Sequence, residues 1–355
     1  MNILKNNVVG AWMTDIDDTL VYSGEMPDEN KINQLADFIS TLKKYHILWV
    51  PMSGVAMVKL GPRILFRLPS EVLDHVVYYG GDGSLKYAYD ESSSSWKEDQ
   101  SFSCLFSDAQ TYMILGDTEY RSSMSELDEL NNVSDAALEQ KIREIREFLE
   151  KKGFGSVPSI LDLLKDELKK NGVDPDLSEA YFRGGSVSWM MLGDISADPY
   201  HSDVNIALRK KLIDISKKWL AEHNHLADLG STGINVPFPG ARGIKFVLIG
   251  NDKERSAREM ISCFGLEPQH VIFAGNELFD GGNDNMIRNI EDVHLLSVGD
   301  REDPGPAVIN GRIKQGLKLI AGVEANKHWM DYVVGKLQSG EGWKSILKGI
   351  RDVAL

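Results

Sequence analysis

The stretch Thr14-Asp15-Ile16-Asp17-Asp18-Thr19-Leu20 follows an apolar run, Val8 to Thr14, which ends abruptly at the first acidic residue. Short apolar runs of this kind are typical of buried parallel strands. Ligands of parallel sheets bind at the carboxyl ends of the strands. The carboxylates of Asp15 and Asp17 are therefore expected at the end of a strand, where a parallel sheet carries out its chemistry.

Two carboxylates at such a position meet the needs of phosphoryl transfer through an aspartyl-phosphate. That reaction needs a carboxylate nucleophile, a metal ion that offsets negative charge, and an acid for the leaving oxygen. Asp15 is the predicted nucleophile and metal ligand, and Asp17 is the predicted acid. The alternatives are a solvated acidic turn and a calcium-binding loop. An EF-hand needs Gly at the position of Leu20 and Glu at that of Met26, so we reject the calcium loop.

The rest of the chain contains four more short apolar runs that end in small or polar residues. They are His46 to Met52, His75 to Tyr79, His270 to Ala274 and His294 to Ser297. Stretches of helical character lie between them, such as Asn30 to Lys44 and Lys253 to Phe264. This alternation predicts an α/β fold, a doubly wound, Rossmann-like parallel sheet.

The pattern changes between about residues 85 and 240. Asp90 to Ser103 is Ser-rich and charged, which predicts a loop. Apolar residues then recur twice at helical spacing, at Leu138, Ile142, Ile145 and Leu149, and at Leu208, Leu212, Ile215 and Trp219. Between these helices, Tyr181 to Leu192 predicts a hairpin centred on Gly184-Gly185. We expect an inserted α+β cap domain over 85–240, with the core formed by 1–84 and 241–355.

Ser53-Gly54 follows the second predicted strand. A hydroxyl and a free backbone N–H at a strand end can bind a phosphate oxygen. Ser-Gly is also a common turn pair, so a plain strand-to-helix turn is the alternative. Ser53 is the predicted catalytic residue of this pair, and Gly54 is predicted to contact the substrate.

A further motif, Val271 to Glu277, is followed by Gly281-Gly282-Asn283-Asp284. Asn276 at the strand end and Asp284 on the glycine-rich loop supply oxygen ligands of the type that Mg²⁺ prefers. A surface turn is the alternative. We expect Mg²⁺ to be the cofactor, with Asp15, Asp17, Asn276 and Asp284 as its ligands.

These motifs resemble those of the haloacid dehalogenase (HAD) superfamily. Asp15-x-Asp17-x-Thr19-Leu20 is similar to its first motif and Ser53 to its second. The resemblance implies that Asp15 is phosphorylated and that Asp17 is the general acid and base. The segment from Gly275 to Asp284 resembles eukaryotic-type phosphomannomutases, which belong to the branch with a C2-type α/β cap.

The third motif of the superfamily is a lysine that offsets charge on the phosphoryl oxygens, and two lysines compete for this role. Lys245, after Phe238-Pro239-Gly240, fits the phosphomannomutase pattern. Lys253, in Gly250-Asn251-Asp252-Lys253, fits the related Cof-type sugar phosphatases. A surface lysine is the alternative for each. Lys245 is placed slightly ahead.

Phe182-Arg183-Gly184-Gly185 resembles the part of the mutase cap that grips the sugar phosphate. Arg183 is therefore a predicted anion clamp, with a surface arginine as the alternative. Asn235 is a weaker candidate, for contact with a sugar hydroxyl. The mutases carry Arg after the cap's Gly, whereas Asp194 follows Gly193 here and would repel a phosphate. This difference favours a magnesium-dependent phosphatase for a sugar phosphate or similar phosphomonoester. A phosphohexomutase and a catalytically silent binding protein are the alternatives.

Composition limits the partners. The 355 residues carry 39 basic and 53 acidic side chains, so the net charge is 39 − 53 = −14. This charge repels nucleic acid and anionic membranes. Cys104 and Cys263, the two cysteines, form neither a disulfide framework nor a zinc spacing. No run of about 18 apolar residues occurs. We expect a cytoplasmic protein that acts on a small phosphorylated substrate. The sequence does not indicate its oligomeric state.

Overall fold

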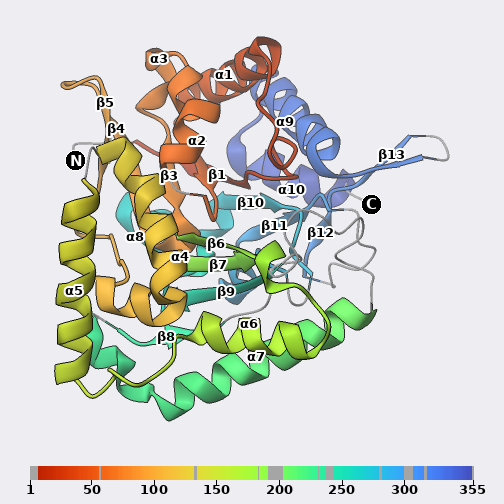
Figure 1. Cartoon of the computed structure of the whole chain (residues 1–355). Coiled ribbons are helices and arrows are strands. Elements are labelled where there is room, and N and C mark those ends of the chain that lie inside the picture. Colours follow the sequence, from red (N-terminus) through yellow and green to blue (C-terminus); the bar gives the residue numbers. More distant parts are fainter. Residues whose placement is uncertain are drawn as a thin grey trace. The chain divides into compact units, whose positions relative to one another are not determined.

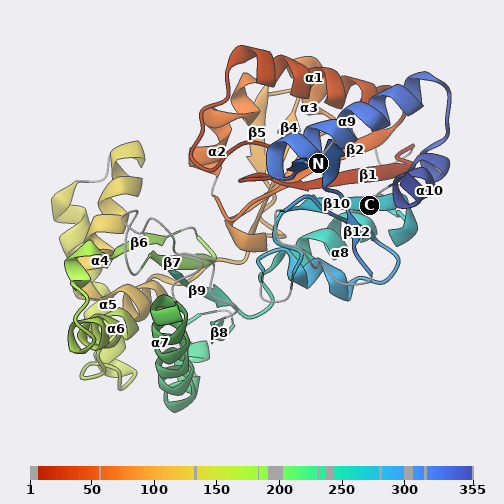
Figure 2. The same cartoon turned by 90° about the vertical axis from the view of Figure 1, so that its right-hand side faces the viewer.

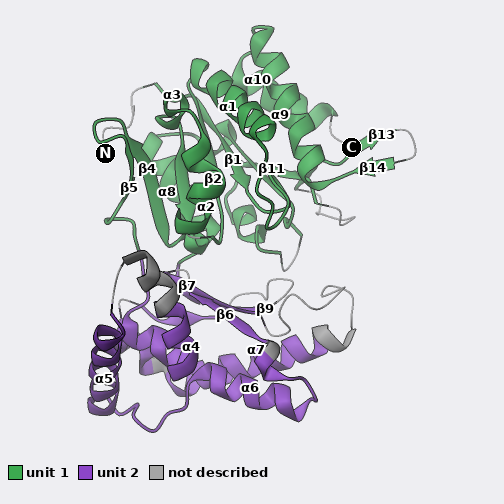
Figure 3. Cartoon of the chain, turned by 45° about the horizontal axis from the view of Figure 1, so that its top comes forward, with its two compact units in different colours: residues 1–103, 251–355 green, residues 104–250 purple. Residues whose placement is uncertain are grey.

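The computed structural model forms two compact units. Unit 1 contains residues 1–103 and 251–355, and unit 2 contains residues 104–250 (Figure 3). The structure describes residues 7–55, 57–131, 134–182, 184–190, 203–230, 232–236, 243–279, 282–299, 307–315 and 318–353.

Unit 1 is built on an eight-stranded sheet. In sheet order its strands are β12 (Ile309–Asn310), β11 (His294–Ser297), β10 (Val271–Gly275), β1 (Gly10–Asp15), β2 (Ile47–Met52), β3 (Val77–Gly80), β4 (Leu85–Asp90) and β5 (Ser95–Glu98). The first six are parallel, and β4 and β5 are antiparallel additions. The predicted α/β fold with a parallel sheet is confirmed.

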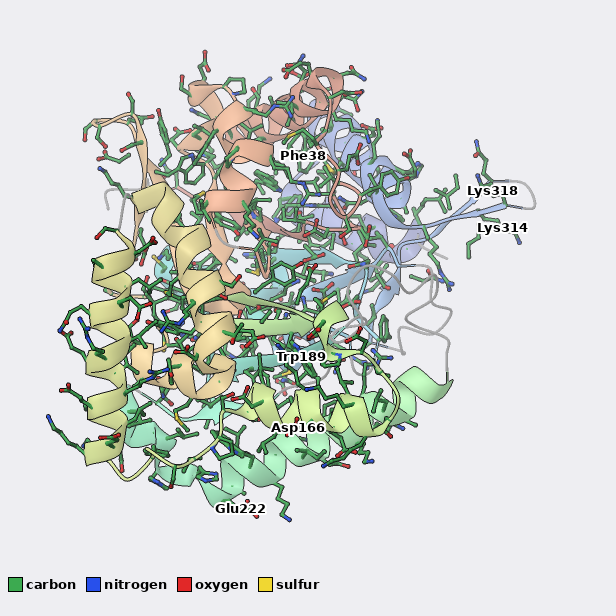
Figure 4. All side chains as sticks on the ribbon, viewed as in Figure 1. Phe38, Asp166, Trp189, Glu222, Lys314 and Lys318 are labelled. Atoms are coloured by element: carbon green, nitrogen blue, oxygen red, sulfur yellow. The ribbon has the colours of Figure 1, made fainter. Side chains whose placement is uncertain are left out.

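Helices cover both faces of this sheet (Figures 1 and 2). One face packs against α1 (Glu29–Lys44), α9 (Gly322–Gln338) and α10 (Trp343–Val353), and the other against α8 (Lys253–Phe264). Successive side chains of β1 point to opposite faces of the sheet. Trp12 therefore belongs to the hydrophobic cluster on the α1 face, whereas Ala11 and Met13 belong to the cluster on the α8 face. Trp12 lies edge-to-face against Phe38 of α1 at 5.7 Å between ring centroids, and Figure 4 labels Phe38.

Shorter elements complete unit 1. They are α2 (Met57–Arg63), α3 (Ser70–Leu73), the hairpin strands β13 (Ile313–Gln315) and β14 (Lys318–Ile320), and the 3-10 turns η1 (Leu65–Arg67), η2 (Gly81–Gly83), η6 (Pro268–His270) and η7 (Asn285–Asn289). The hairpin carries the exposed side chains of Lys314 and Lys318 away from the sheet (Figure 4).

Both boundaries of the inserted domain differ from the predicted ones. Strands β4 and β5 continue the sheet of unit 1, so the insertion begins after Ser103 and not at residue 85. The loop predicted from Asp90 to Ser103 contains strand β5, because the Ser-rich segment is a hairpin turn and Trp96 packs edge-to-face on Tyr89. At the other end, Gly243 begins a strand of unit 2, so the core resumes at Asn251 and not at residue 241.

Unit 2 is an α+β unit with its own hydrophobic core. Its sheet, antiparallel throughout, has the order β6 (Glu179–Phe182), β7 (Ser186–Met190), β9 (Gly243–Leu248) and β8 (Ile234–Asn235). Its helices are α4 (Asp108–Asn131), α5 (Asp135–Lys151), α6 (Ile160–Lys170) and α7 (Asp203–Glu222), and its 3-10 turns are η3 (Pro175–Leu177) and η5 (Asn224–Leu229). The predicted hairpin is present as β6 and β7, with Trp189 of β7 fully buried (Figure 4).

Two helices of unit 2 were not predicted. The two periodic apolar patterns of the sequence correspond to α5 and α7. The structure contains α4 and α6 in addition. In the part of the chain that the structure describes, no helix is long and apolar enough to cross a membrane.

The separate cores predict that packing defects stay local. Leu164 of α6 and Ile39 of α1 are both fully buried, in unit 2 and unit 1 respectively. Truncation of either to Ala leaves a cavity that costs about 2–5 kcal/mol. In Leu164→Ala, we expect faster hydrogen exchange in α6 and in α4, which packs against it, with unchanged exchange in β1 and β2. Ile39→Ala is the matched control and should give the reverse pattern. Equal acceleration in both units by Leu164→Ala would contradict two independent cores.

Candidate active site

Three parallel strands bring the predicted site residues to one edge of the sheet. Asp15, at the end of β1, lies beside Met52 of β2, the residue before Ser53. On the other side, Thr14 pairs with Ala274, two residues before Asn276. Because β1, β2 and β10 run parallel and side by side, the motifs that follow them lie close together, as the sequence predicts.

A lysine joins two of the motifs. The Nζ atom of Lys253 lies 2.5 Å from Oδ1 of Asp15 and 2.5 Å from Oδ1 of Asp284. All three side chains are buried, with residue exposures of 4%, 7% and 1% respectively. Lys253 is held there because it is the first residue of α8. Asp252 is the N-cap of that helix, and its side chain accepts a hydrogen bond from the backbone N–H of Arg255 at 2.7 Å.

This contact concerns one of the two lysines that compete for the role of offsetting charge. Lys253 is the lysine beside the predicted nucleophile, Asp15. Lys245 lies on β9 of unit 2, where it pairs with Ser188 of β7. Asp252 and Lys253 thus stand at the start of a helix, as the Cof-type pattern predicts for that lysine.

One ammonium group faces two buried carboxylates. The pKa of Asp15 is raised to about 8, mainly because the carboxylate is buried and also because Asp284 is close, although Lys253 acts to lower it. Burial alone would lower the pKa of Lys253, but Asp15 and Asp284 together raise that pKa above its usual value. When both carboxylates are ionised, the cluster carries one uncompensated negative charge. A divalent cation would offset this charge.

Asp284 is fixed by the backbone of its own loop. Its Oδ2 atom accepts a hydrogen bond from the backbone N–H of Glu277 at 3.1 Å. The carboxylate also lies directly over Gly275, where an added Cβ would be 2.3 Å from Oδ2 of Asp284. Gly275 therefore leaves the space that the Asp284 carboxylate fills.

The donor set fits Mg²⁺. Asp15 and Asp284 offer carboxylate oxygens, and Asn276 offers an amide oxygen, Oδ1, which accepts one hydrogen bond from the buried Thr19 hydroxyl at 3.2 Å. Mg²⁺ is commonly bound by one or two carboxylates and keeps several waters. Within the described residues, no group of three or more His, Cys, Asp or Glu side chains is arranged to hold a metal.

The side chain of Asp17 is paired with an arginine. Nη1 of Arg63 donates a hydrogen bond to Oδ1 of Asp17 at 2.7 Å. The Arg63 side chain is 12% exposed and that of Asp17 is 30% exposed. Asp17 is thus a partly accessible carboxylate beside the site, which suits the predicted role of proton donor better than the predicted role of side-chain metal ligand.

Ser53 is buried at the end of β2. Its backbone N–H donates to the carbonyl of Tyr79 at 2.9 Å, and its Oγ accepts from the backbone N–H of Val55 at 3.0 Å. The hydroxyl proton remains available for a phosphate oxygen, and the half-buried Gly54 follows directly. The geometry is compatible with the predicted phosphate contact.

Of the predicted substrate residues of the cap, the structure describes Asn235. Asn235 is an exposed residue of β8 in unit 2. Arg183, Gly193 and Asp194 fall outside the described residues.

Sequence reasoning missed Arg63, Thr19 as a bridge to Asn276, and the steric role of Gly275. Thr19 and Gly275 belong to the quoted motifs. Only the fold shows that the Thr19 hydroxyl contacts Asn276 and that the Asp284 carboxylate lies beside Gly275. Arg63 carries no local signal that separates it from a surface arginine.

Comparison with solved structures returned proteins of low sequence identity. An N-terminally truncated IMP-nucleotidase of Plasmodium falciparum is similar with a TM-score of 0.44 and 11% identity, covering 79% of this chain and 64% of that one. A Synechocystis sucrose-phosphatase, in complex with sucrose and phosphate, is similar with a TM-score of 0.42 and 12% identity. The match covers 82% of this chain and 83% of that one. A trehalose-6-phosphate phosphatase related protein is similar with a TM-score of 0.46 and 11% identity. The match covers 93% of this chain and 100% of that one.

This chain spans less than two thirds of the length of the truncated nucleotidase. No family model matches the chain, and no curated protein matches it.

The crowding at Gly275 gives a stability prediction. In Gly275→Ala, the added methyl group meets the Asp284 carboxylate, and overpacking of this kind costs about 1–3 kcal/mol. Gly335 in α9 is the matched control, because an added Cβ meets nothing within 4 Å. Gly335→Ala should leave the free energy of unfolding equal or raise it by up to about 1 kcal/mol, since Ala favours a helix. Equal effects of both substitutions in urea unfolding would refute the packing of Asp284 over Gly275.

Proposed function

We propose that this chain is a magnesium-dependent phosphatase of the haloacid dehalogenase superfamily. Its proposed substrate is a sugar phosphate or a similar small phosphomonoester. The observation that supports this most strongly is the contact of Lys253 with both Asp15 and Asp284. It joins a nucleophile, a cation and a second carboxylate at the carboxyl edge of a parallel sheet, where ligands bind.

In the proposed first step, a carboxylate oxygen of Asp15 attacks the phosphorus atom of the substrate. A bond forms between Asp15 and phosphorus while the bond from phosphorus to the leaving oxygen breaks. Asp17 gives a proton to that oxygen, so the product leaves as a neutral alcohol. In this proposal, Lys253 and the Ser53 hydroxyl contact the phosphoryl oxygens, and Lys253 offsets their negative charge.

In the second step, Asp17 takes a proton from water, and the water oxygen attacks the phosphorus atom of the aspartyl-phosphate. The bond to Asp15 breaks, inorganic phosphate leaves, and both aspartates return to their starting states. Asp15, Asp284 and Asn276 would hold Mg²⁺, which when bound supplies positive charge that brings the anionic phosphate to the anionic nucleophile.

Substrate class is tested by phosphate release. The protein is incubated with Mg²⁺ and a panel of sugar phosphates, including glucose-1-phosphate and mannose-1-phosphate with a trace of hexose bisphosphate. Inorganic phosphate without an isomerised sugar phosphate supports the phosphatase. Isomerised product in place of phosphate would show a mutase, and the absence of both, with the fold intact, would show a protein that binds without turnover.

The nucleophile is tested by Asp15→Asn. The amide is nearly isosteric with the carboxylate but is a poor nucleophile, so we expect release of phosphate from an aryl phosphate to fall to the uncatalysed rate. The variant should remain folded by circular dichroism, because it keeps the volume of Asp15. Activity within tenfold of the wild type would remove Asp15 from the reaction.

The two lysines are tested against each other. Lys253→Met removes the positive charge beside Asp15, and we expect kcat to fall by about 10²–10³-fold, as for loss of one stabilising donor at the reacting centre. Lys245→Met should keep kcat within about threefold of the wild type, because Lys245 pairs with Ser188 on the sheet of unit 2, whereas Lys253 contacts Asp15. The opposite ranking of the two variants would restore Lys245 as the charge-offsetting lysine.

A further inference from the structure

Arg63 connects the end of α2 to the loop between β1 and α1. Besides Oδ1 of Asp17, its guanidinium donates to two backbone carbonyls of that loop. Nε donates to Glu25 at 2.6 Å and Nη2 to Tyr22 at 2.7 Å. Three donors of one planar group therefore meet three acceptors of one loop, and the fixed fork of arginine holds those acceptors in a defined geometry.

The loop itself is tightly turned. Asp18, directly after Asp17, has a φ of +59°, in the left-handed region that side chains other than Gly seldom adopt. Its carboxylate accepts a hydrogen bond from the backbone N–H of Ser23 at 2.9 Å, which closes the turn. Arg63 binds on both sides of this turn, at Asp17 before it and at Tyr22 and Glu25 towards its end. The direction of the Asp17 side chain is thus tied to the loop as a whole.

The pairing engages only one oxygen of Asp17. Arg63 binds Oδ1, whereas Oδ2 accepts no hydrogen bond from the described residues. A carboxylate that is held by one oxygen and open at the other is oriented for proton transfer through the open oxygen.

We propose that Arg63 is a positioning residue that orients Asp17 for protonation of the leaving group. This inference rests on the proposed phosphatase function. As the bond from Asp15 to phosphorus forms, the leaving oxygen takes the electron pair of the breaking bond and receives a proton from Oδ2 of Asp17. Arg63 touches neither the phosphate nor the leaving oxygen, and it acts by fixing the position of Oδ1.

This role predicts an effect that depends on the leaving group. An acidic phenol such as p-nitrophenol leaves as a stable anion and needs little help from an acid. A sugar alcohol is a much poorer leaving group and needs the proton in the transition state. Loss of the orientation of Asp17 should therefore slow an alkyl phosphate far more than an aryl phosphate. A residue that only supports the fold would slow both substrates by the same factor.

The experiment compares Arg63→Met with a matched arginine. Arg67, in η1, donates to the carbonyl of Pro27 at 2.6 Å and to Oε1 of Glu29 at 2.5 Å, at the far end of the same loop, without a contact to Asp17. Each variant is assayed with p-nitrophenyl phosphate and with the best sugar phosphate of the panel. For Arg63→Met, we expect kcat to fall at least about 100-fold on the sugar phosphate and less than about tenfold on the aryl phosphate. For Arg67→Met, the two substrates should change by the same factor.

A double variant decides whether Arg63 acts through Asp17. In Asp17→Asn the acid is already lost, so adding Arg63→Met should lower kcat on the sugar phosphate by less than about threefold more. Independent, multiplicative losses would overturn the inference, as would an equal loss on both substrates in Arg63→Met alone. If Arg63→Met does not fold, Arg63→Lys replaces it. A fall in its ratio of alkyl to aryl activity supports the inference, and an unchanged ratio overturns it.

Failure of the underlying function gives a different result. If the wild-type protein releases phosphate from neither class of substrate, the proposed phosphatase activity is wrong, and the role of Arg63 is wrong with it. If the wild type hydrolyses both but the Arg63 variants show no preference between leaving groups, only the role of Arg63 is overturned.

Discussion

The buried ammonium group of Lys253 is the interaction on which the rest of the site depends. It joins the end of β1 to the loop after β10, through contacts between residues that are 238 and 31 positions apart in the chain. Two buried carboxylates that contact the same ammonium group would repel each other strongly without that cation between them. Loss of one partner from a buried charge cluster of this kind costs about 3–5 kcal/mol. Lys253 therefore helps to hold the edge of the sheet in the form that the proposed chemistry needs.

The same cluster explains why the site calls for a second cation. One positive charge does not balance two carboxylates, and burial makes the remaining negative charge costly. The oxygen ligands of Asp15, Asp284 and Asn276 suit a hard divalent ion. Backbone details around the cluster serve this arrangement, because the absence of a side chain at Gly275 leaves room for Asp284. Charge balance, metal preference and local packing are thus consequences of one arrangement.

Much of the fold and of the site could be predicted because the signals are local. A short apolar run that ends in a polar residue marks a buried strand and its functional end in a single stretch, which is why β1, β2 and β10 and the residues after them were found. The choice between Lys245 and Lys253 was different, since both follow plausible local patterns. It depends on which lysine the fold brings to Asp15, and that is a property of tertiary structure.

Other features were hidden for related physical reasons. The Ser-rich segment before Ser95 has the composition of a loop, yet it is a hairpin turn whose second strand adds to the sheet edge. Arg63 lies 46 residues from Asp17 in the sequence and meets it only in the folded chain. Pairings of this kind follow from the way the loop after β1 packs against α2, which hydrophobic periodicity does not report.

The central claim, that Asp15 becomes phosphorylated, can be tested directly. The protein is mixed with Mg²⁺ and a substrate that it hydrolyses, quenched in acid at times shorter than one turnover, and digested for peptide mass spectrometry. The account predicts that a phosphoryl group appears on Asp15 and is lost as inorganic phosphate is released, at a rate fast enough to support turnover. Steady release of phosphate with no phosphoryl group on Asp15 at any time, or with the group on another residue, would contradict the account.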